Sequence, residues 1–295
     1  MKTDRTRLAI FAGLGVYTLW GFTFLASRIA QNYVTPFALL AFRFDIAALL
    51  LAIPLLIGRQ KVTLKGKHIM RLLIPGLMEP CLYFIGEQYG IRYTNSAFSG
   101  VMIAIIPIVT LLFAGFLLHE RPSPAQWAFS VLSILGIIVI TLLENKGGSI
   151  SLRGVLCLVM AVVTGSLYTI LSRKISNEFT VYERTLLTQI IGGVFYTLLM
   201  LLQYRTNLAS LLASFVYQDF VFAILYLAVF GSVIGYTLFN YSVANAPTAK
   251  VVVLCNLTTI LSVLAGVLIL GESFSPFSAV AMVVVLIGII GVQKS

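Results

Sequence analysis

The chain has 295 residues, of which 59% are hydrophobic and only 10% are charged, and its mean hydropathy is +1.01. Soluble domains carry about 25% charged residues, and a water-soluble globule of this size could not bury so much apolar surface. The composition therefore excludes a soluble enzyme, a disordered chain and a nucleic-acid binder, in spite of a net charge of +10. The three cysteines lie inside apolar runs, so no disulfide framework is predicted.

Ten apolar runs follow one another along the chain, and each is long enough to form a membrane helix. A helix needs about 20 residues to cross a hydrocarbon layer of about 30 Å. The runs lack the alternation of a membrane β-barrel, and the first leads straight into a second span, unlike a cleaved signal peptide. We predict an all-α integral membrane protein with ten transmembrane helices at 8–28, 36–57, 72–91, 96–118, 125–143, 154–172, 184–203, 219–241, 247–270 and 276–292.

Lysine and arginine are distributed unevenly among the segments between these runs. With the N-terminus inside, 14 basic residues fall on the inner side and 5 on the outer side, while Arg43 lies within the second run. Because segments rich in lysine and arginine stay in the cytoplasm, both termini are predicted to be cytoplasmic in a multi-pass protein of the inner (plasma) membrane. The inner set includes Arg173 and Arg184.

The two halves of the chain resemble each other. Near the start of each half, Ser27-Arg28 matches Ser172-Arg173 at a separation of 145 residues. Further along, a separation of 152 residues relates Glu120 to Glu272, Pro124 to Pro276, and Gly136 to Gly288. Each half holds five predicted helices, and an odd number makes the second half enter the membrane from the opposite side. Inverted repeats of this kind are typical of transporters, so we predict two repeats, at 1–145 and 152–293.

Short motifs near the ends of the spans support a family assignment. They are Trp20-Gly21, Ser27-Arg28, Arg43-Phe44, Tyr89-Gly90-Ile91-Arg92-Tyr93-Thr94, Ser96-Ala97, Leu118-His119-Glu120, Ala246-Pro247-Thr248-Ala249 and Leu270-Gly271-Glu272. Together they resemble the EamA branch of the drug/metabolite transporter superfamily over nearly the whole chain. The resemblance implies ten helices around a central cavity, which move small organic solutes by alternating access, and many relatives are described as exporters of amino acids or other metabolites. The chain departs from the family at His119, where glycine is usual, and at Thr259, which takes the place that matches Pro107.

Four ionisable side chains lie inside the predicted spans. They are Arg43 and Asp45 in the second span, and Glu79 and Glu87 in the third. Each costs at least about 2.5–3.5 kcal/mol in hydrocarbon unless it faces a cavity or a partner. Arg43 and Glu87 lie at similar depths below the outer edge, so we expect that they can pair. Asp45 lies on nearly the opposite helix face from Arg43, where it can serve another helix or a water defect on the lipid side.

Glu79 is the strongest candidate for a functional group. It lies deep in the third span, about 20 Å from the outer edge, and shares one helix face with Tyr83 and Glu87. Pro80 should kink the span beside it. We hypothesise that Glu79 lines the cavity and either binds a cationic group or carries a coupling proton. The alternative is a protonated, hydrogen-bonded glutamate without a transport role.

The second half carries no acids that match Glu79 and Glu87, so its side of the cavity should be hydrogen-bonding rather than charged. Aromatic rings are also available there and in the first span to hold a cation or an aromatic solute, although packing or interface anchoring is the plainer interpretation of each ring. The predicted binding set is Glu79, Tyr83, Glu87, Arg43, Trp20, Tyr168, Gln189, Asn240 and Asn256.

The sequence lacks the common signatures of energy-coupled and metal-dependent enzymes. It has no G-x-x-x-x-G-K-[ST] loop and no H-E-x-x-H motif, and its two histidines lie at membrane edges. We therefore predict no enzyme activity, no cofactor and no metal, with transport driven by an ion gradient, by exchange or by the solute's own gradient.

The favoured function is export of amino acids or related metabolites. The alternatives are efflux of cationic or aromatic drug-like compounds, metabolite uptake, a lipid-acting membrane enzyme, and a non-transporting membrane sensor or scaffold. Ten helices suffice to enclose a cavity, so a monomer is compatible with this function, and the sequence leaves the oligomeric state open.

Overall fold

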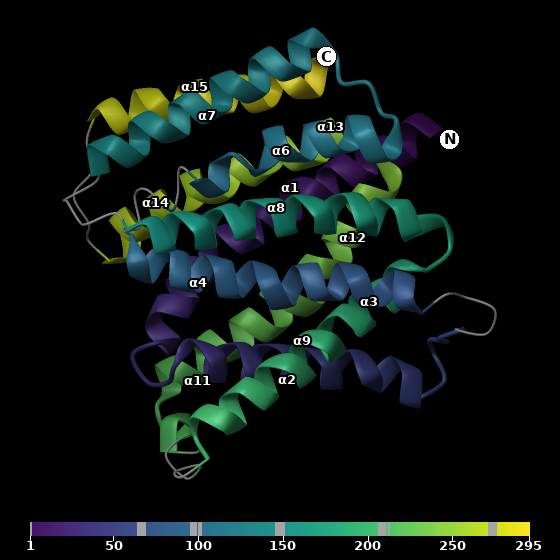
Figure 1. The fold of residues 1–295 in the computed structure, drawn as a ribbon, viewed down its shortest axis with the longest axis vertical. Helices are drawn as coiled ribbons and strands as arrows, with labels where there is room; N and C mark the ends of the chain where they lie inside the picture. The colour runs from purple at the N-terminus through teal and green to yellow at the C-terminus, as the bar shows by residue number, and fades with distance from the viewer. Residues whose placement is uncertain are drawn as a thin grey trace.

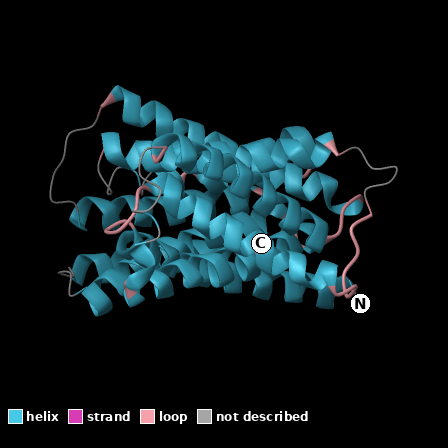
Figure 2. Cartoon of the chain, turned by 90° about the horizontal axis from the view of Figure 1, so that it is seen from below, coloured by secondary structure: helices cyan, strands magenta, loops and turns pink. Residues whose placement is uncertain are grey.

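A computed structural model describes residues 2–63, 69–94, 99, 102–144, 151–205, 211, 213–270 and 276–295. Throughout this described part the chain is helical and contains no strand, and the helices run across the molecule between two ends that carry the loops (Figures 1 and 2). The all-α prediction is therefore confirmed.

The first half of the chain forms five helical spans. The second of them begins at a proline, whose fixed φ suits the first helical turn. The third is broken by a kink at Glu79, and a wider π-type turn ends the fourth. In order, the spans are α1 (Lys2–Ala30); α2 (Pro36–Leu56); α3 (Met70–Gly76), η1 (Leu77–Leu82) and α4 (Tyr83–Tyr93); α6 (Ile106–Phe113) and η2 (Ala114–Leu118); and α7 (Pro124–Glu144).

The second half forms five more spans, so the prediction of about ten membrane helices is confirmed. They are α8 (Leu152–Lys174), followed by η3 (Ile175–Asn177); α9 (Val181–Gln203), followed by η4 (Ser214–Val216); α11 (Gln218–Tyr226), η5 (Leu227–Ile234) and α12 (Gly235–Asn245); α13 (Thr248–Val252), η6 (Val253–Cys255) and α14 (Asn256–Leu270); and α15 (Pro276–Lys294). The predicted start of the fourth span at residue 96 lies outside the described residues.

The helices place apolar side chains outside and polar ones inside, as a bilayer requires. On α9, Val194 and Leu198 are each 58% exposed, whereas Gln189 and Tyr196, on the opposite face, are fully buried. Five of the helices are long and apolar enough to cross a membrane, and shorter apolar helices lie beside them. Lipid tails can cover the outer apolar face, while the polar inner face has to find partners within the bundle.

Each close helix pair between the halves has a counterpart five spans further along the chain. Helix α4 of the third span packs against α8 of the sixth span. The repeat-related pair is α12 of the eighth span and α1 of the first span, which also pack together. The second span packs on the seventh (α2 on α9), and the fifth packs on the tenth (α7 on α15), where the two helices lie side by side in Figure 1. The packing therefore follows a two-repeat fold.

The glycines matched at a separation of 152 residues contact equivalent positions in the other half. A Cβ atom on Gly136 would lie 2.9 Å from the Ala281 carbonyl oxygen and 3.1 Å from the Val285 nitrogen. A Cβ atom on Gly288 would lie 2.7 Å from the Phe129 carbonyl oxygen and 2.8 Å from the nitrogen of Ser133, which is the repeat equivalent of Val285. Both positions require glycine because α7 and α15 approach backbone to backbone.

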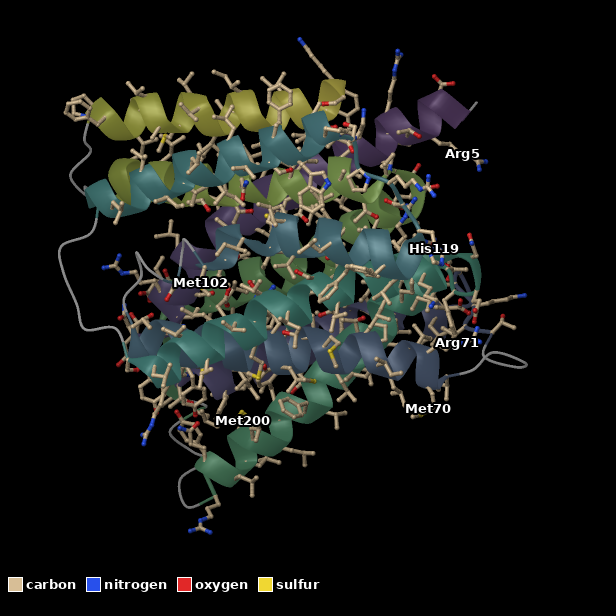
Figure 3. The ribbon with its side chains drawn as sticks, turned by 45° about the horizontal axis from the view of Figure 1, so that its top comes forward. Arg5, Met70, Arg71, Met102, His119 and Met200 are labelled. Atoms are coloured by element: carbon tan, nitrogen blue, oxygen red, sulfur yellow. The ribbon has the colours of Figure 1, made fainter. Side chains whose placement is uncertain are left out.

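Both chain ends lie toward the same end of the bundle (Figure 1), which we call the termini end. Arg5, Arg71 and His119 lie at the termini end, whereas Met102 and Met200 lie toward the opposite end (Figure 3). This placement agrees with an even number of spans.

Replacing Gly136 with alanine should destabilise the protein. A methyl group there meets backbone atoms of α15, and overpacking costs about 1–3 kcal/mol, against a gain in helix propensity of about 1 kcal/mol. Gly115→Ala is the matched control, because the nearest atom to its added Cβ is 3.8 Å away. Thermal unfolding in detergent should give a lower midpoint for Gly136→Ala and an unchanged or higher one for Gly115→Ala. Equal midpoints would contradict the close approach.

Candidate functional site

The third span is interrupted in the middle of the bundle, as the proline pattern predicts. Within η1, Glu79 has extended backbone angles (φ −141°, ψ 124°), directly before Pro80. A second π-type segment, η5, interrupts the eighth span, which is the repeat counterpart of the third. Interruptions of this kind in α-helices are frequent at functional sites because they free backbone groups. The two-repeat fold thus places one break from each half in the bundle.

Glu79 is buried and receives its hydrogen bond from the other half of the chain. Its side chain is 9% exposed, and Oε1 accepts a hydrogen bond of 2.8 Å from the Tyr236 hydroxyl on α12. Tyr83 donates instead to Glu87, over 2.9 Å, one turn further along α4. The structure therefore brings Tyr83 and Glu87 together, while Glu79 contacts α12, a partner that the sequence pattern did not identify.

Arg43 also turns toward the eighth span. Its Nε donates to Ser232 Oγ over 2.8 Å, and its guanidinium carbon lies 5.3 Å and 5.2 Å from the ring centres of Phe44 and Phe84. Within the described part of the chain Arg43 forms no ion pair with Glu87, so the expected contact is not made. Ser232 takes its place because η5 lies directly beside α2.

Asp45 contacts a different helix, as expected from its position on the other face of α2. It is partly buried, and its Oδ2 accepts a hydrogen bond of 2.6 Å from Thr197 Oγ1 on α9. Gly193 lies beside it, since a Cβ atom there would be 2.4 Å from Asp45 Oδ1. Asp45 therefore joins the two halves away from Arg43.

Aromatic rings surround the partner of Glu79. The ring of Phe239 stacks between Trp20 and Tyr168, with centres 5.5 Å and 5.6 Å away, and Tyr236 contacts both neighbours edge-on. Such stacked and edge-on pairs are favourable geometries. Trp20 Nε1 also donates to the Gly231 carbonyl oxygen in η5 over 2.8 Å. We call Tyr17, Trp20, Tyr168, Tyr236 and Phe239 the aromatic cluster.

A second buried polar group lies where α8, α9 and α12 meet. Asn240 accepts a hydrogen bond of 2.6 Å from Ser172 and donates to Thr185 over 3.1 Å. Gln189, one turn beyond Thr185 on α9, is fully buried, and neither its amide nitrogen nor its amide oxygen has a hydrogen-bond partner. The predicted residues Gln189 and Asn240 therefore share one face of the interior.

Arg184 belongs to this group, which corrects its expected place in the topology. The capping box formed by Thr180 and Glu183 starts α9 at Val181, three residues before the predicted boundary. Arg184 therefore lies inside the helix and is only 2% exposed, with a hydrogen bond of 2.7 Å from Nη2 to the Asn240 carbonyl oxygen. The T-x-x-E pattern before the apolar run was the sequence signal for this earlier start.

Asn256 lies elsewhere. It is buried, and its Nδ2 donates to Ser133 Oγ on α7 over 2.8 Å, while Ser133 in turn contacts the Val285 carbonyl oxygen on α15. Its polar contacts therefore hold the α7 and α15 side of the bundle rather than the surroundings of Glu79.

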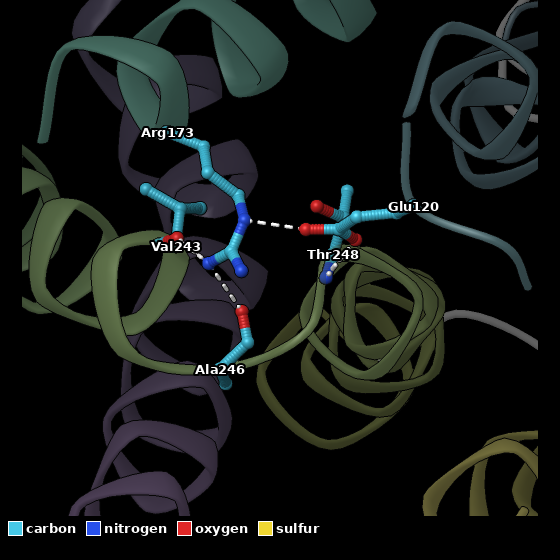
Figure 4. Close-up of polar contacts among 5 residues, drawn as sticks. All are labelled: Glu120, Arg173, Val243, Ala246 and Thr248. Carbon is cyan, nitrogen blue, oxygen red and sulfur yellow. Dashed lines mark hydrogen bonds and ion pairs between the residues drawn. The ribbon is translucent and has the colours of Figure 1, made fainter. Parts of the chain in front are cut away.

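An ion pair joins the two halves at the termini end (Figure 4). Arg173 donates from Nε to Glu120 Oε1 over 2.6 Å, and from Nη1 to the Val243 and Ala246 carbonyl oxygens over 2.6 Å and 2.7 Å. Glu120 Oε2 also accepts a hydrogen bond of 3.0 Å from the backbone nitrogen of Thr248. We call this ion pair with its three backbone contacts the Glu120–Arg173 contact.

Two features border the Glu120–Arg173 contact. A pocket of about 340 Å³ lies beside it, lined by Glu120, Arg121, Pro122, Gln126, Arg173, Pro247 and Ala249. The preceding residue, His119, has a left-handed backbone (φ 55°), which explains why glycine suits this position. Glu272, the sequence counterpart of Glu120, lies outside the described residues.

Known proteins resemble this chain over almost its full length. The model of the EamA-like transporter family matches residues 7–142 and 152–293. An uncharacterized transporter of Bacillus subtilis (strain 168), YcxC, is 31% identical over 274 residues, which cover 92% of this chain and 88% of the relative. An uncharacterized transporter of Archaeoglobus fulgidus is 22% identical, with coverage of 92% and 94%. A solved crystal structure shares the fold, with a TM-score of 0.80 at 20% identity over 97% of this chain and 96% of that one. Since the family model matches both halves, this protein belongs to the EamA-like transporter family.

Proposed function

We propose that this transporter exports amino acids or related small metabolites by alternating access across the inner membrane. The two halves, near 1–145 and 152–293, act as inverted repeats, and both termini lie in the cytoplasm. The excess of basic residues in the segments assigned to the inner side supports this orientation.

The buried contact between Glu79 and Tyr236 carries the proposal. A carboxylate in the bundle interior costs several kcal/mol unless it is neutralised or hydrogen-bonded, so Glu79 favours an ammonium group or a proton as its ligand. Among the described residues, the hydrogen bond that it accepts comes from a phenol hydroxyl of the other half. A solute amine or a proton that reaches Glu79 competes with that contact, which couples binding to the packing of the two halves.

The Glu120–Arg173 contact supports closure of the cytoplasmic side in this conformation. It ties the end of the fourth span to the sixth, eighth and ninth spans through one salt bridge and three backbone contacts. Alternating access requires such a contact to break when the cytoplasmic side opens. Glu79 and the aromatic cluster would then be reached from the cytoplasm, where an exporter collects its solute.

The aromatic cluster favours a second candidate function, which is efflux of cationic or aromatic compounds. Stacked rings can hold a flat solute or a cation by their π faces. Uptake, a membrane enzyme and a non-transporting sensor are the further alternatives. Efflux from proteoliposomes separates transport from the last two, and the chemical nature of the solute separates the transport alternatives.

Replacing Glu79 with glutamine should abolish efflux. Glutamine keeps the shape and accepts a hydrogen bond from Tyr236, but it can neither carry a proton nor neutralise an amine. Proteoliposomes loaded with labelled amino acids should lose efflux about tenfold or more, together with its pH dependence. Glu178→Gln, which removes an exposed carboxylate paired with Arg71 at the termini end, should leave efflux unchanged. Normal efflux with unchanged pH dependence in Glu79→Gln would remove Glu79 from the proposal.

The Glu120–Arg173 contact should behave as one unit in a double-mutant cycle. Glu120→Gln and Arg173→Gln should each lower the unfolding midpoint, and the double variant should be little worse than the poorer single one. Because both side chains are about a quarter exposed, solvent limits the coupling free energy to about 1 kcal/mol. Strictly additive effects would show that the two side chains do not stabilise this conformation together.

A further inference from the structure

Arg184 is a buried cation that the protein satisfies with neutral groups alone. Its Nη1 donates to the carbonyl oxygen and the hydroxyl of Ser172, each over 2.9 Å, and to Asn240 Oδ1 over 3.3 Å, while Nη2 donates to the Asn240 carbonyl oxygen. Within the described part of the chain no carboxylate forms an ion pair with it. The carboxylate of its neighbour Glu183 accepts hydrogen bonds from the backbone nitrogens of Thr63 and Thr180. Among the described residues the positive charge therefore has no counterion, which is a costly state for a buried guanidinium.

Buried polar atoms without partners lie on α8 and α9, the two helices that meet Asn240 beside this charge. Arg184 Nε, the Tyr168 hydroxyl and both amide atoms of Gln189 are buried and make no hydrogen bond. Tyr168 lies one turn before Ser172 on α8, and Gln189 lies one turn after Thr185 on α9, so both project from the helix faces that contact Asn240. Buried polar groups in native proteins are nearly always satisfied, which indicates that a ligand takes these hydrogen bonds during the transport cycle.

Neighbouring residues on α8, α9 and α12 link the unsatisfied group to Glu79. Tyr236, which donates to Glu79, is one turn before Asn240 on α12, a rise of about 6 Å. The rings of Tyr168 and Tyr236 are 6.1 Å apart. On α9, Gly192 lies three residues after Gln189, and a Cβ atom there would be 2.5 Å from Pro80 Cγ. Adjacent turns of the same helices thus connect a buried anion with a buried cation.

We infer that Arg184, with Gln189 and Tyr168, binds the carboxylate of the transported solute while Glu79 receives its amine. This inference rests on the proposed function. It assigns solute binding to Arg184, which the sequence analysis counts only among the basic residues of the inner side. The free Nε, the Gln189 amide and the Tyr168 hydroxyl supply donors for two carboxylate oxygens. One carboxylate balances the single positive charge. A phosphate dianion would leave excess negative charge beside Arg184 in an interior that already holds the Glu79 carboxylate.

The test measures ligand selectivity, which a purely structural arginine would not alter. The ligands are the twenty amino acids and their α-carboxamides, which keep the amine and the side chain but lack the negative charge of the α-carboxylate. Each is added to the full-length protein in detergent, and its dissociation constant is obtained from the shift of the unfolding midpoint. At least one amino acid should bind about tenfold or more tightly than its amide. Arg184→Met should remove that preference, Arg184→Lys should retain part of it, and Arg71→Met, at an exposed ion pair, should retain all of it.

The Gln189→Leu variant provides a second test of the carboxylate site, and this test does not depend on whether Arg184→Met folds. Leucine loses no hydrogen bond, because the glutamine amide has none, so the unfolding midpoint should stay level or rise. Binding of the amino acid should nevertheless weaken several-fold. A lower midpoint with unchanged binding would show that Gln189 serves structure rather than the solute, and would overturn the inference.

Other outcomes are equally decisive. Equal binding of acids and amides, an unchanged preference in Arg184→Met, no stabilisation by any of the twenty amino acids, or stronger stabilisation by inorganic phosphate would each overturn the carboxylate site. Efflux from vesicles is measured separately. If Glu79→Gln lowers efflux but Arg184→Met does not, the proposal of export is supported and the carboxylate site is refuted. Selective binding without efflux leaves the site standing and removes export.

Discussion

A charge buried in a membrane bundle has to find a polar partner, and here most of those partners come from the other half of the chain. Glu79 takes a hydrogen bond from Tyr236, Arg43 donates to Ser232, and Asp45 accepts from a threonine on α9. Because hydrocarbon offers nothing in exchange, these contacts can change only when the halves move together or when a solute or proton replaces one partner. The same interactions therefore hold the two halves of the fold together.

The two-repeat architecture places those contacts in a scaffold whose two halves pack alike. The glycine contacts between α7 and α15 follow the repeat atom by atom, whereas the helix breaks in the third and eighth spans carry different side chains. Glu79 occupies the first break, and Gly231, its sequence counterpart, occupies the second. The scaffold is thus nearly symmetric while the chemistry is not, because the first break carries a carboxylate and the second a glycine.

The apolar runs predicted the spans because membrane helices must hide their backbone, and that requirement is visible in composition alone. The break at Pro80 was predictable for the same local reason. The partners were not, because a tyrosine such as Tyr236 or a serine such as Ser232 in an apolar helix looks like packing until the opposing helix is known. Arg184 was misplaced by three residues of helix, which only the T-x-x-E cap could have revealed. Asn256 has the polarity of a cavity residue but faces α7.

Water access to the interior from one side at a time is the central claim, and a single thiol tests it most directly. Ser232→Cys, in a chain whose Cys81, Cys157 and Cys255 are replaced by alanine, puts a small reporter beside Arg43. A charged, membrane-impermeant thiol reagent is applied to one face of sealed vesicles and then to the other. The account predicts slow labelling from the cytoplasmic face that rises when Glu120→Gln breaks the ion pair. Failure to label from either face, in both proteins, would contradict a water-accessible interior.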